Sequence, residues 1–172
     1  MAIYALGDQV PDIHPTAYVH PEAIVIGSVT LGPEVTVWPG AVLRGDYGTI
    51  SVDARTSIQD GTVLHTTARW STVIGAECVV GHNAHLEGCH VEDRCLVGSG
   101  STVLNRARVG HGSVVGAGAV VTEDTEVPAG STALGVPARI RAGGIDASRH
   151  DDAVASYVEN GRRYAVELKP LP

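Results

Sequence analysis

Two residues able to bind a metal, His65 and Glu87, fall one above the other when the sequence is arranged in its own repeat. Each directly follows an aliphatic residue that recurs at every sixth position, so each side chain should point outward from a short strand. Neighbouring strands are about 4.7 to 4.9 Å apart, and imidazole nitrogens and carboxylate oxygens bind zinc at about 2.0 to 2.2 Å. His65 and Glu87 could therefore hold one cation between them.

His82 is the third candidate ligand, and it belongs to a different face of the same repeat. It lies above Asp60 and beside Gln59, and it points away from the face that carries His65. We therefore expect His82 of the partner subunit to complete the site, and three such contacts close a ring as a cyclic homotrimer. The alternative is that these are solvated surface groups, but stacked ligands beside two long loops favour a metal site.

The six-residue repeat itself predicts the fold. Aliphatic residues recur at this interval along nearly the whole chain, which is typical of a parallel β-helix. The residue two positions earlier is small, as at Ala41 and Ala84, and both side chains should face the interior of an all-β triangular prism with three hexads per turn. A β-sandwich with accidental spacing is the weaker alternative. One inward column is expected to contain Val25, Leu43, Leu64, Leu86, Val103 and Val121, and the preceding column Val19, Val37, Ile58, Val80, Val97 and Val115.

Two irregularities and the end of the chain complete the expected architecture. The intervals from Leu43 to Val52 and from Leu64 to Ile74 are too long, which predicts loops near residues 45–51 and 66–73 at one corner of the prism. Residues 147–166 read as an amphipathic helix. We therefore expect a β-helix domain over residues 1–140, with residues 141–172 forming a C-terminal helix and tail packed on it.

Composition and charge exclude several classes of protein. The net charge of −7 and the lack of a basic stripe argue against nucleic acid as a partner. No apolar run approaches a membrane span, and the N-terminus has no signal-peptide core, so a cytoplasmic location is expected. Cys78, Cys89 and Cys95 all occupy the small inward position of the repeat, which predicts buried thiols rather than a metal cluster or a nucleophile.

The segments LRGDYGTISV, TSIQDGTVLH, VVGHNAHLEGC and LVGSGSTVL together resemble the γ-class carbonic anhydrase-like family of left-handed hexapeptide-repeat proteins, over about residues 10–165. The resemblance implies a left-handed β-helix, a handedness that general rules for parallel crossovers would not predict. It also implies a trimer with a metal at each subunit interface, and a C-terminal helix packed along the prism. The implied reaction is hydration of carbon dioxide to bicarbonate by a metal-bound hydroxide.

The family holds its metal with three histidines, of which His65 and His82 match two, whereas Glu87 stands at the third position. His85 is a less favoured replacement, because it precedes its aliphatic residue instead of following it. Zinc remains the expected metal, with iron or cobalt as alternatives for a set of two histidines and one carboxylate. A carboxylate ligand should leave the bound water less acidic, so we expect slow hydration near neutral pH.

The resemblance also implies roles for three further residues. Arg44 and Asp46 would form a salt-bridged pair beside the metal, and Gln59 would hydrogen-bond the bound water or hydroxide. An intersubunit ion-pair cluster of Arg44, Asp46 and Asp60 is an equally good interpretation. Tyr47 stands directly after Asp46, where the best-studied enzymes of this class carry an acidic proton-transfer residue.

Three functions remain open on the sequence. The first is a metal-dependent carbonic anhydrase-like lyase. The second is a hexapeptide acyltransferase or thioester-processing enzyme, because coenzyme A-dependent acyltransferases share this fold. The third is a non-catalytic metal-binding trimeric scaffold. The fold alone does not separate them.

Overall fold

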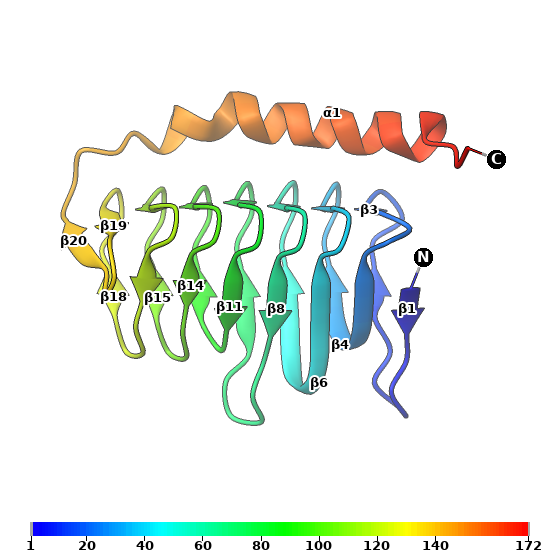
Figure 1. Cartoon of the computed structure of the whole chain (residues 1–172), viewed down its shortest axis with the longest axis horizontal. Coiled ribbons are helices and arrows are strands. Elements are labelled where there is room, and N and C mark those ends of the chain that lie inside the picture. The colour runs from blue at the N-terminus through cyan, green and yellow to red at the C-terminus, as the bar shows by residue number, and fades with distance from the viewer. Residues whose placement is uncertain (1, 172) are drawn as a thin grey trace.

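The chain winds into a triangular parallel β-helix whose three faces are made of short strands stacked in register (Figure 1). The computed structural model describes residues 2–171. Most strands are two or three residues long, because the chain must turn after each hexad to reach the next face. The expected parallel β-helix is therefore confirmed, with one antiparallel pair, β19 with β20, at its C-terminal end.

The face that carries His65 and Glu87 is called the site face here. Its strands are β1 (Ala2–Tyr4), the first halves of β4 (Ile24–Leu31) and β6 (Val42–Val52), β8 (Val63–His65), β11 (His85–Glu87), β14 (Thr102–Val103) and β17 (Val120–Val121). The inward column predicted for this face is confirmed residue by residue, from the pair Val25 and Leu43 to the pair Val103 and Val121.

The second face is covered by the C-terminal helix and is called the helix face. Its strands are β3 (Tyr18–Val19), β5 (Thr36–Val37), β7 (Ser57–Ile58), β10 (Val79–Val80), β13 (Leu96–Val97), β16 (Val114–Val115), β19 (Thr132–Leu134) and β20 (Arg139–Arg141). The predicted column from Val19 to Val115 is also confirmed in full.

The third face turns hydrophilic residues outward and is called the polar face. Its strands are β2 (Asp12–Ile13), the second halves of β4 and β6, β9 (Thr72–Ile74), β12 (His90–Val91), β15 (Arg108–Val109) and β18 (Glu126–Val127). Its outward column includes Thr30, Ser51, His90, Arg108 and Glu126. Leu31, Val52 and Ile74 point inward from the same strands and are fully buried.

The interior is a narrow column of aliphatic and small side chains. Leu43, Leu64 and Leu86 are completely buried, and Ala41 and Ala84 beside them leave the room that these larger side chains fill. Burial of each Leu or Val contributes about 1.5 to 3 kcal/mol, so the stacked columns supply most of the drive to fold. The three cysteines are buried as predicted.

One expected loop is instead part of a strand. Residues 45–51 lie within β6, which bends around the corner and pairs with β4 on both the site face and the polar face. The extra residues are absorbed by an irregularity of register between Gly27 and Val29, so backbone pairing continues through the corner. The second loop is shorter than expected, because β9 begins at Thr72. Both features project from the same edge of the prism, as predicted (Figure 1).

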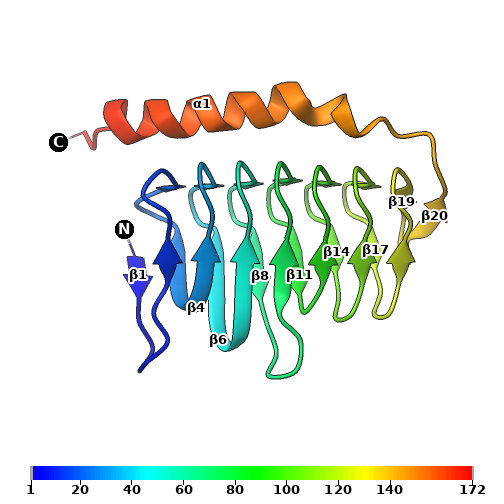
Figure 2. The ribbon, with the colours of Figure 1, turned by 180° about the vertical axis from the view of Figure 1, so that it is seen from behind.

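The C-terminal segment forms a 3-10 turn (Ala147–His150) followed by α1 (Asp151–Glu167), close to the predicted range of 147–166. Helix α1 runs back along the prism toward β3 (Figure 2). Val154 and Val158 are buried, and Gly161 is required because an added Cβ would lie 2.6 Å from the Thr36 side chain. No helix among residues 2–171 is long and apolar enough to cross a membrane.

A ladder of alternating charges joins α1 to the prism. Glu34, Arg55, Glu77 and Arg94 occupy successive turns in the left-handed backbone region, with φ between 55° and 61°. Arg55 pairs with Glu34 at 3.4 Å and with Glu77 at 3.2 Å, and Arg94 pairs with Glu77 at 2.8 Å. Helix α1 pairs with both ends of the ladder, through Arg162 to Glu34 and through Asp151 to Arg94. These pairs fix the position of the helix along the prism.

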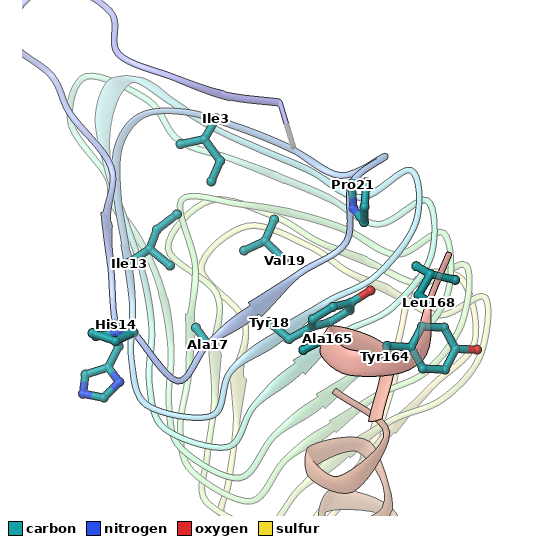
Figure 3. A pocket seen from close by; sticks show the side chains of 11 residues that line it. Ile3, Ile13, His14, Ala17, Tyr18, Val19, Pro21, Tyr164, Ala165 and Leu168 are labelled. Atoms are coloured by element: carbon teal, nitrogen blue, oxygen red, sulfur yellow. The ribbon is translucent and has the colours of Figure 1, made fainter. Parts of the chain in front are cut away.

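The N-terminal end of the prism carries an open apolar groove of about 490 Å³ (Figure 3). Ile13 and Val19 line it, because the first layer has no complete layer above it, and Leu168 closes one side. Its lining includes neither His65 nor His82. The groove is therefore separate from the candidate metal site.

Candidate metal centre

His65 ends β8 and lies between Arg44 and Glu87 in a register that stacks all three outward. This is the outward column that the repeat predicted. The inward neighbour Leu64 is completely buried, so the strand cannot rotate without exposing it. His65 and Glu87 therefore share one surface because of the hydrophobic column behind them.

Asp46 orients the His65 ring. His65 Nε2 donates a hydrogen bond to Asp46 Oδ1 at 3.0 Å, and Arg44 Nη1 donates to the other carboxylate oxygen. Burial by itself raises the pKa of Asp46, but the hydrogen bonds from His65 and Arg44 outweigh it and place that pKa below its ordinary value. Asp46 is therefore a carboxylate at neutral pH, and it leaves His65 Nδ1 directed to Glu87.

Glu87 is approached by two histidines. Its Oε2 atom lies 3.6 Å from His65 Nδ1 and 3.5 Å from His85 Nε2. His85 and Glu87 are two residues apart on β11 and project to the same side, since Leu86 between them points inward. In the sequence, His85 is the less favoured ligand because it precedes its aliphatic residue. The period of two along a strand was the signal that would have placed it beside Glu87.

His82 lies at the corner that follows the helix face, as predicted. Its Nδ1 atom donates to Asp60 Oδ2 at 2.9 Å, and about half of each side chain is exposed. His65 and His82 thus share one arrangement: one ring nitrogen bonds a carboxylate and the other remains available. Metal-binding histidines usually have such a carboxylate partner, which fixes the ring orientation.

One protomer does not enclose a metal by itself. Among residues 2–171, no three His, Cys, Asp or Glu side chains converge closely enough to hold an ion. The structure brings His65, Glu87, Asp46 and Arg44 together and leaves His82 at another corner. A divalent metal held by His65 and Glu87 would therefore need a further donor from outside this cluster.

Gln59 lies away from His65 within the protomer. Its side chain is 3% exposed on the helix face, and its Nε2 donates to Ser57 Oγ at 2.6 Å. Ser57 Oγ also accepts hydrogen bonds from Trp38 Nε1 at 2.9 Å and from Thr36 Oγ1 at 2.8 Å. Trp38 in turn packs against Tyr157 and Tyr164 of α1. The expected role of Gln59 toward a bound water stays a prediction.

The loop that follows His65 is held in place by hydrogen bonds of Thr72 and by the contact of Trp70 with Arg106. Thr72 Oγ1 donates to the His65 carbonyl oxygen and accepts from the Gly88 amide at 2.8 Å, so it links the ends of β8 and β11. The Trp70 ring lies 4.3 Å from the Arg106 guanidinium, which pairs with Glu123 and Asp124. The ring of Tyr47 stands edge-on to His65, with 6.4 Å between centroids. Aromatic side chains therefore flank the site.

Among the described residues, no basic side chain acts on the pKa of the Cys78 or Cys89 thiol. Burial raises the pKa of Cys89 to about 12. Burial also raises the pKa of Cys78 well above its ordinary value. Both thiols stay protonated at neutral pH, which agrees with a packing role.

Comparison with known proteins places the chain in a family. Models of the bacterial transferase hexapeptide and of the hexapeptide repeat of succinyl-transferase match residues 71–105 and 90–123. The carnitine operon protein CaiE of Escherichia coli K12 is 39% identical over 139 residues, which is 81% of this chain and 71% of CaiE. The chain belongs to the hexapeptide-repeat left-handed β-helix family.

Other members of the hexapeptide-repeat family are similar in sequence or structure. Mitochondrial gamma carbonic anhydrase 1 of Arabidopsis thaliana is 40% identical over 138 residues, which is 77% of this chain and 50% of the plant protein. A hexapeptide transferase family protein from Anaplasma phagocytophilum superposes with a TM-score of 0.90 at 32% identity, over 95% of this chain and 98% of that one. The expected family and fold are thereby confirmed.

Proposed function

We propose that this chain is a metal-dependent, γ-carbonic anhydrase-like protein that hydrates carbon dioxide at sites shared between the subunits of a homotrimer. The observation that carries the proposal is the matched arrangement of His65 and His82. Each ring is oriented by a carboxylate, Asp46 or Asp60, and each keeps a second nitrogen available. Glu87 stands 3.6 Å from the available nitrogen of His65. The similarity to the plant γ-carbonic anhydrase supports the reaction.

The site face supplies a surface for a second copy. Each strand of this face also turns outward the residue two positions before the column that contains His65 and Glu87. These residues form a second outward column directly beside the first, and it is largely aliphatic and half-buried in the isolated protomer. The column contains Ile24, Val42, Val63, His85, Thr102 and Val120. The helix face is covered by α1 and the polar face is hydrophilic, so the aliphatic column is the surface best suited to burial between subunits.

A ring follows from the placement of the two halves of the site. His65 and Glu87 lie at one corner of the prism and His82 at another, so each protomer offers both halves in different directions. A contact of this head-to-tail type closes into a ring when the rotation is 120°. A homotrimer then contains three sites, each with His65 and Glu87 of one protomer and His82 of the partner subunit.

The donor set suits zinc, with iron or cobalt as alternatives, since two imidazoles and one carboxylate bind all three metals. A bound divalent metal supplies Lewis acidity, which lets water act as a nucleophile near neutral pH. Asp46 and Asp60 hold the histidine rings in place, and Arg44 keeps Asp46 ionised. Glu87 adds negative charge to the site, so we expect slower hydration near neutral pH than three histidines would give.

The test is to measure oligomeric state, metal content and hydration on one preparation of the full chain. Light scattering should show a trimer, elemental analysis about one metal per protomer, and stopped-flow assays measurable carbon dioxide hydration that chelation abolishes. A monomer with full metal occupancy would contradict the shared site. A metal-loaded trimer inactive across the pH range would contradict the enzyme and leave a metal-binding scaffold.

Acyl transfer is the competing function. PerB from Caulobacter crescentus, solved in complex with CoA and GDP-perosamine, is 30% identical with a TM-score of 0.55, over 77% of this chain and 57% of PerB. Calorimetric titration of the metal-loaded trimer with acetyl-coenzyme A distinguishes the two functions. Specific binding of acetyl-coenzyme A together with absent hydration would favour acyl transfer.

A further inference from the structure

We propose that His85 is a positioning residue that holds the Glu87 carboxylate in place for metal binding. This inference rests on the proposed function, because it concerns the same site. His85 Nε2 lies 3.5 Å from Glu87 Oε2, the oxygen that also faces His65 Nδ1. His85 on the same strand and His65 on the neighbouring strand therefore both lie close to that oxygen, and together they limit where the carboxylate can move.

The place of His85 in the fold is unusual for a polar ring. The outward positions paired directly below and above it are Val63 and Thr102, and the same column continues to Val42 and Val120. A histidine in a β-branched column on a surface suited to subunit contact needs a polar partner, because burial of an unpaired polar group is unfavourable. Glu87 is the partner that the structure provides.

The backbone around Glu87 is already fixed, so the remaining freedom is in its side chain. Leu86 is completely buried, and the Gly88 amide is bonded to Thr72 Oγ1 at 2.8 Å. A free glutamate side chain loses rotamer entropy when it is immobilised. A ring that restricts the carboxylate before metal binding reduces that loss. Partners of metal ligands typically change metal affinity by about 10-fold to 100-fold when they are removed.

Cobalt(II) titration of the full-length protein tests the proposal, with visible absorption as a readout of the ligand geometry. His85→Val removes the polar ring and restores the residue type found at Val42, Val63 and Val120, so the prism should fold and assemble. His85→Gln keeps an amide nitrogen at similar reach. We expect His85→Val to weaken cobalt binding about 10-fold to 100-fold and to alter the absorption spectrum, whereas His85→Gln stays close to the native protein.

His90→Val is the matched control, because His90, like His85, directly precedes an inward aliphatic residue but lies on the polar face. It should leave affinity and spectrum unchanged. Unchanged cobalt binding in His85→Val would overturn the positioning role while leaving the proposed function intact. Failure of His85→Gln to rescue would also overturn it, since a direct ligand role would then apply. A native protein that does not bind cobalt would overturn the proposed function, and this inference with it.

Discussion

At the scale of single residues, Glu87 is the decisive departure from a set of three histidines. A carboxylate brings a full negative charge to a position where an imidazole would be neutral. It occupies the position that stacks on His65, so replacement by histidine keeps the location and removes the negative charge. The residue therefore offers a direct test of how the site controls the acidity of water.

We expect Glu87→His to move the pH dependence of carbon dioxide hydration to lower pH. Less negative charge at the site favours ionisation of water, and one pKa unit corresponds to about 1.4 kcal/mol, or about tenfold in the active fraction near neutral pH. The measurement is a stopped-flow pH–rate profile of both proteins at equal zinc occupancy. An unchanged pH–rate profile with full zinc occupancy would show that Glu87 does not make the bound water less acidic.

Asp46 is the second residue with a clear physical role. Its hydrogen bonds with His65 and Arg44 lower its pKa in the folded protein, so it contributes stability above the ordinary pKa of aspartate. That contribution is lost as the pH falls below about 4 and through the lower, folded value. The pair is partly exposed, so the net contribution is about 1 kcal/mol.

We expect Asp46→Asn to reduce the free energy of unfolding by about 1 kcal/mol at pH 7 and to have little effect near pH 2. Urea unfolding of the metal-free protein at both pH values measures this difference. Metal affinity should fall about 10-fold or more, because His65 loses the carboxylate that orients it. An equal loss of stability at both pH values would contradict a charge-based role.

At the scale of elements, the end of β11 and the loop after β8 depend on each other. Gly88 has φ of +59°, and an added Cβ would lie 2.1 Å from Asn105 Oδ1 and 3.1 Å from Trp70 Cβ. The positive φ and the close approach of Asn105 and Trp70 therefore favour glycine at the turn after Glu87. The stacking of Trp70 on Arg106 then holds the loop against this turn.

We expect Gly88→Ala to destabilise the protein by about 2 to 4 kcal/mol and to release the 66–71 loop. Gly100→Ala is the matched control, because Gly100 has φ of +66° and no atom within 4 Å of an added Cβ. Gly100→Ala should lower the free energy of unfolding only through backbone strain, by about 1 to 2 kcal/mol. Urea unfolding measures both, and limited proteolysis should cut the loop in Gly88→Ala alone. Equal losses in the two variants would mean that the contact with Trp70 is unimportant.

At the scale of the whole molecule, the three faces of the prism differ in what covers them. Helix α1 packs on the strands β3, β5 and β7, and the charge ladder fixes its position. The polar face turns hydrophilic side chains to solvent, so it does not need to be covered by a helix or by another subunit. The proposed trimer would therefore assemble through the site face, which also carries His65 and Glu87 of the candidate metal site.

We expect Val63→Glu to dissociate the trimer without unfolding the protomer, because a charge would be buried at the centre of the subunit contact. Val73→Glu is the matched control, since Val73 holds the same place before an inward residue on the polar face. Light scattering should report a monomer for the first variant and a trimer for the second. A trimeric Val63→Glu protein would show that subunits meet elsewhere.

Residue spacing is enough to predict the prism and the stacking of His65 on Glu87. The reason is local and periodic: a side-chain period of two within each strand and a hexad per face fix which residues point inward and which lie in one column. Confirmation of both inward columns, residue by residue, shows how strongly spacing alone specifies this fold.

Contacts that do not follow this period could be read only from the folded chain. The path of residues 45–51 depended on backbone pairing around a corner, which the length of the interval does not reveal. The place of Gln59 depended on Trp38 and on α1. Such contacts arise from packing between segments distant in the chain, and periodic spacing carries no information about them.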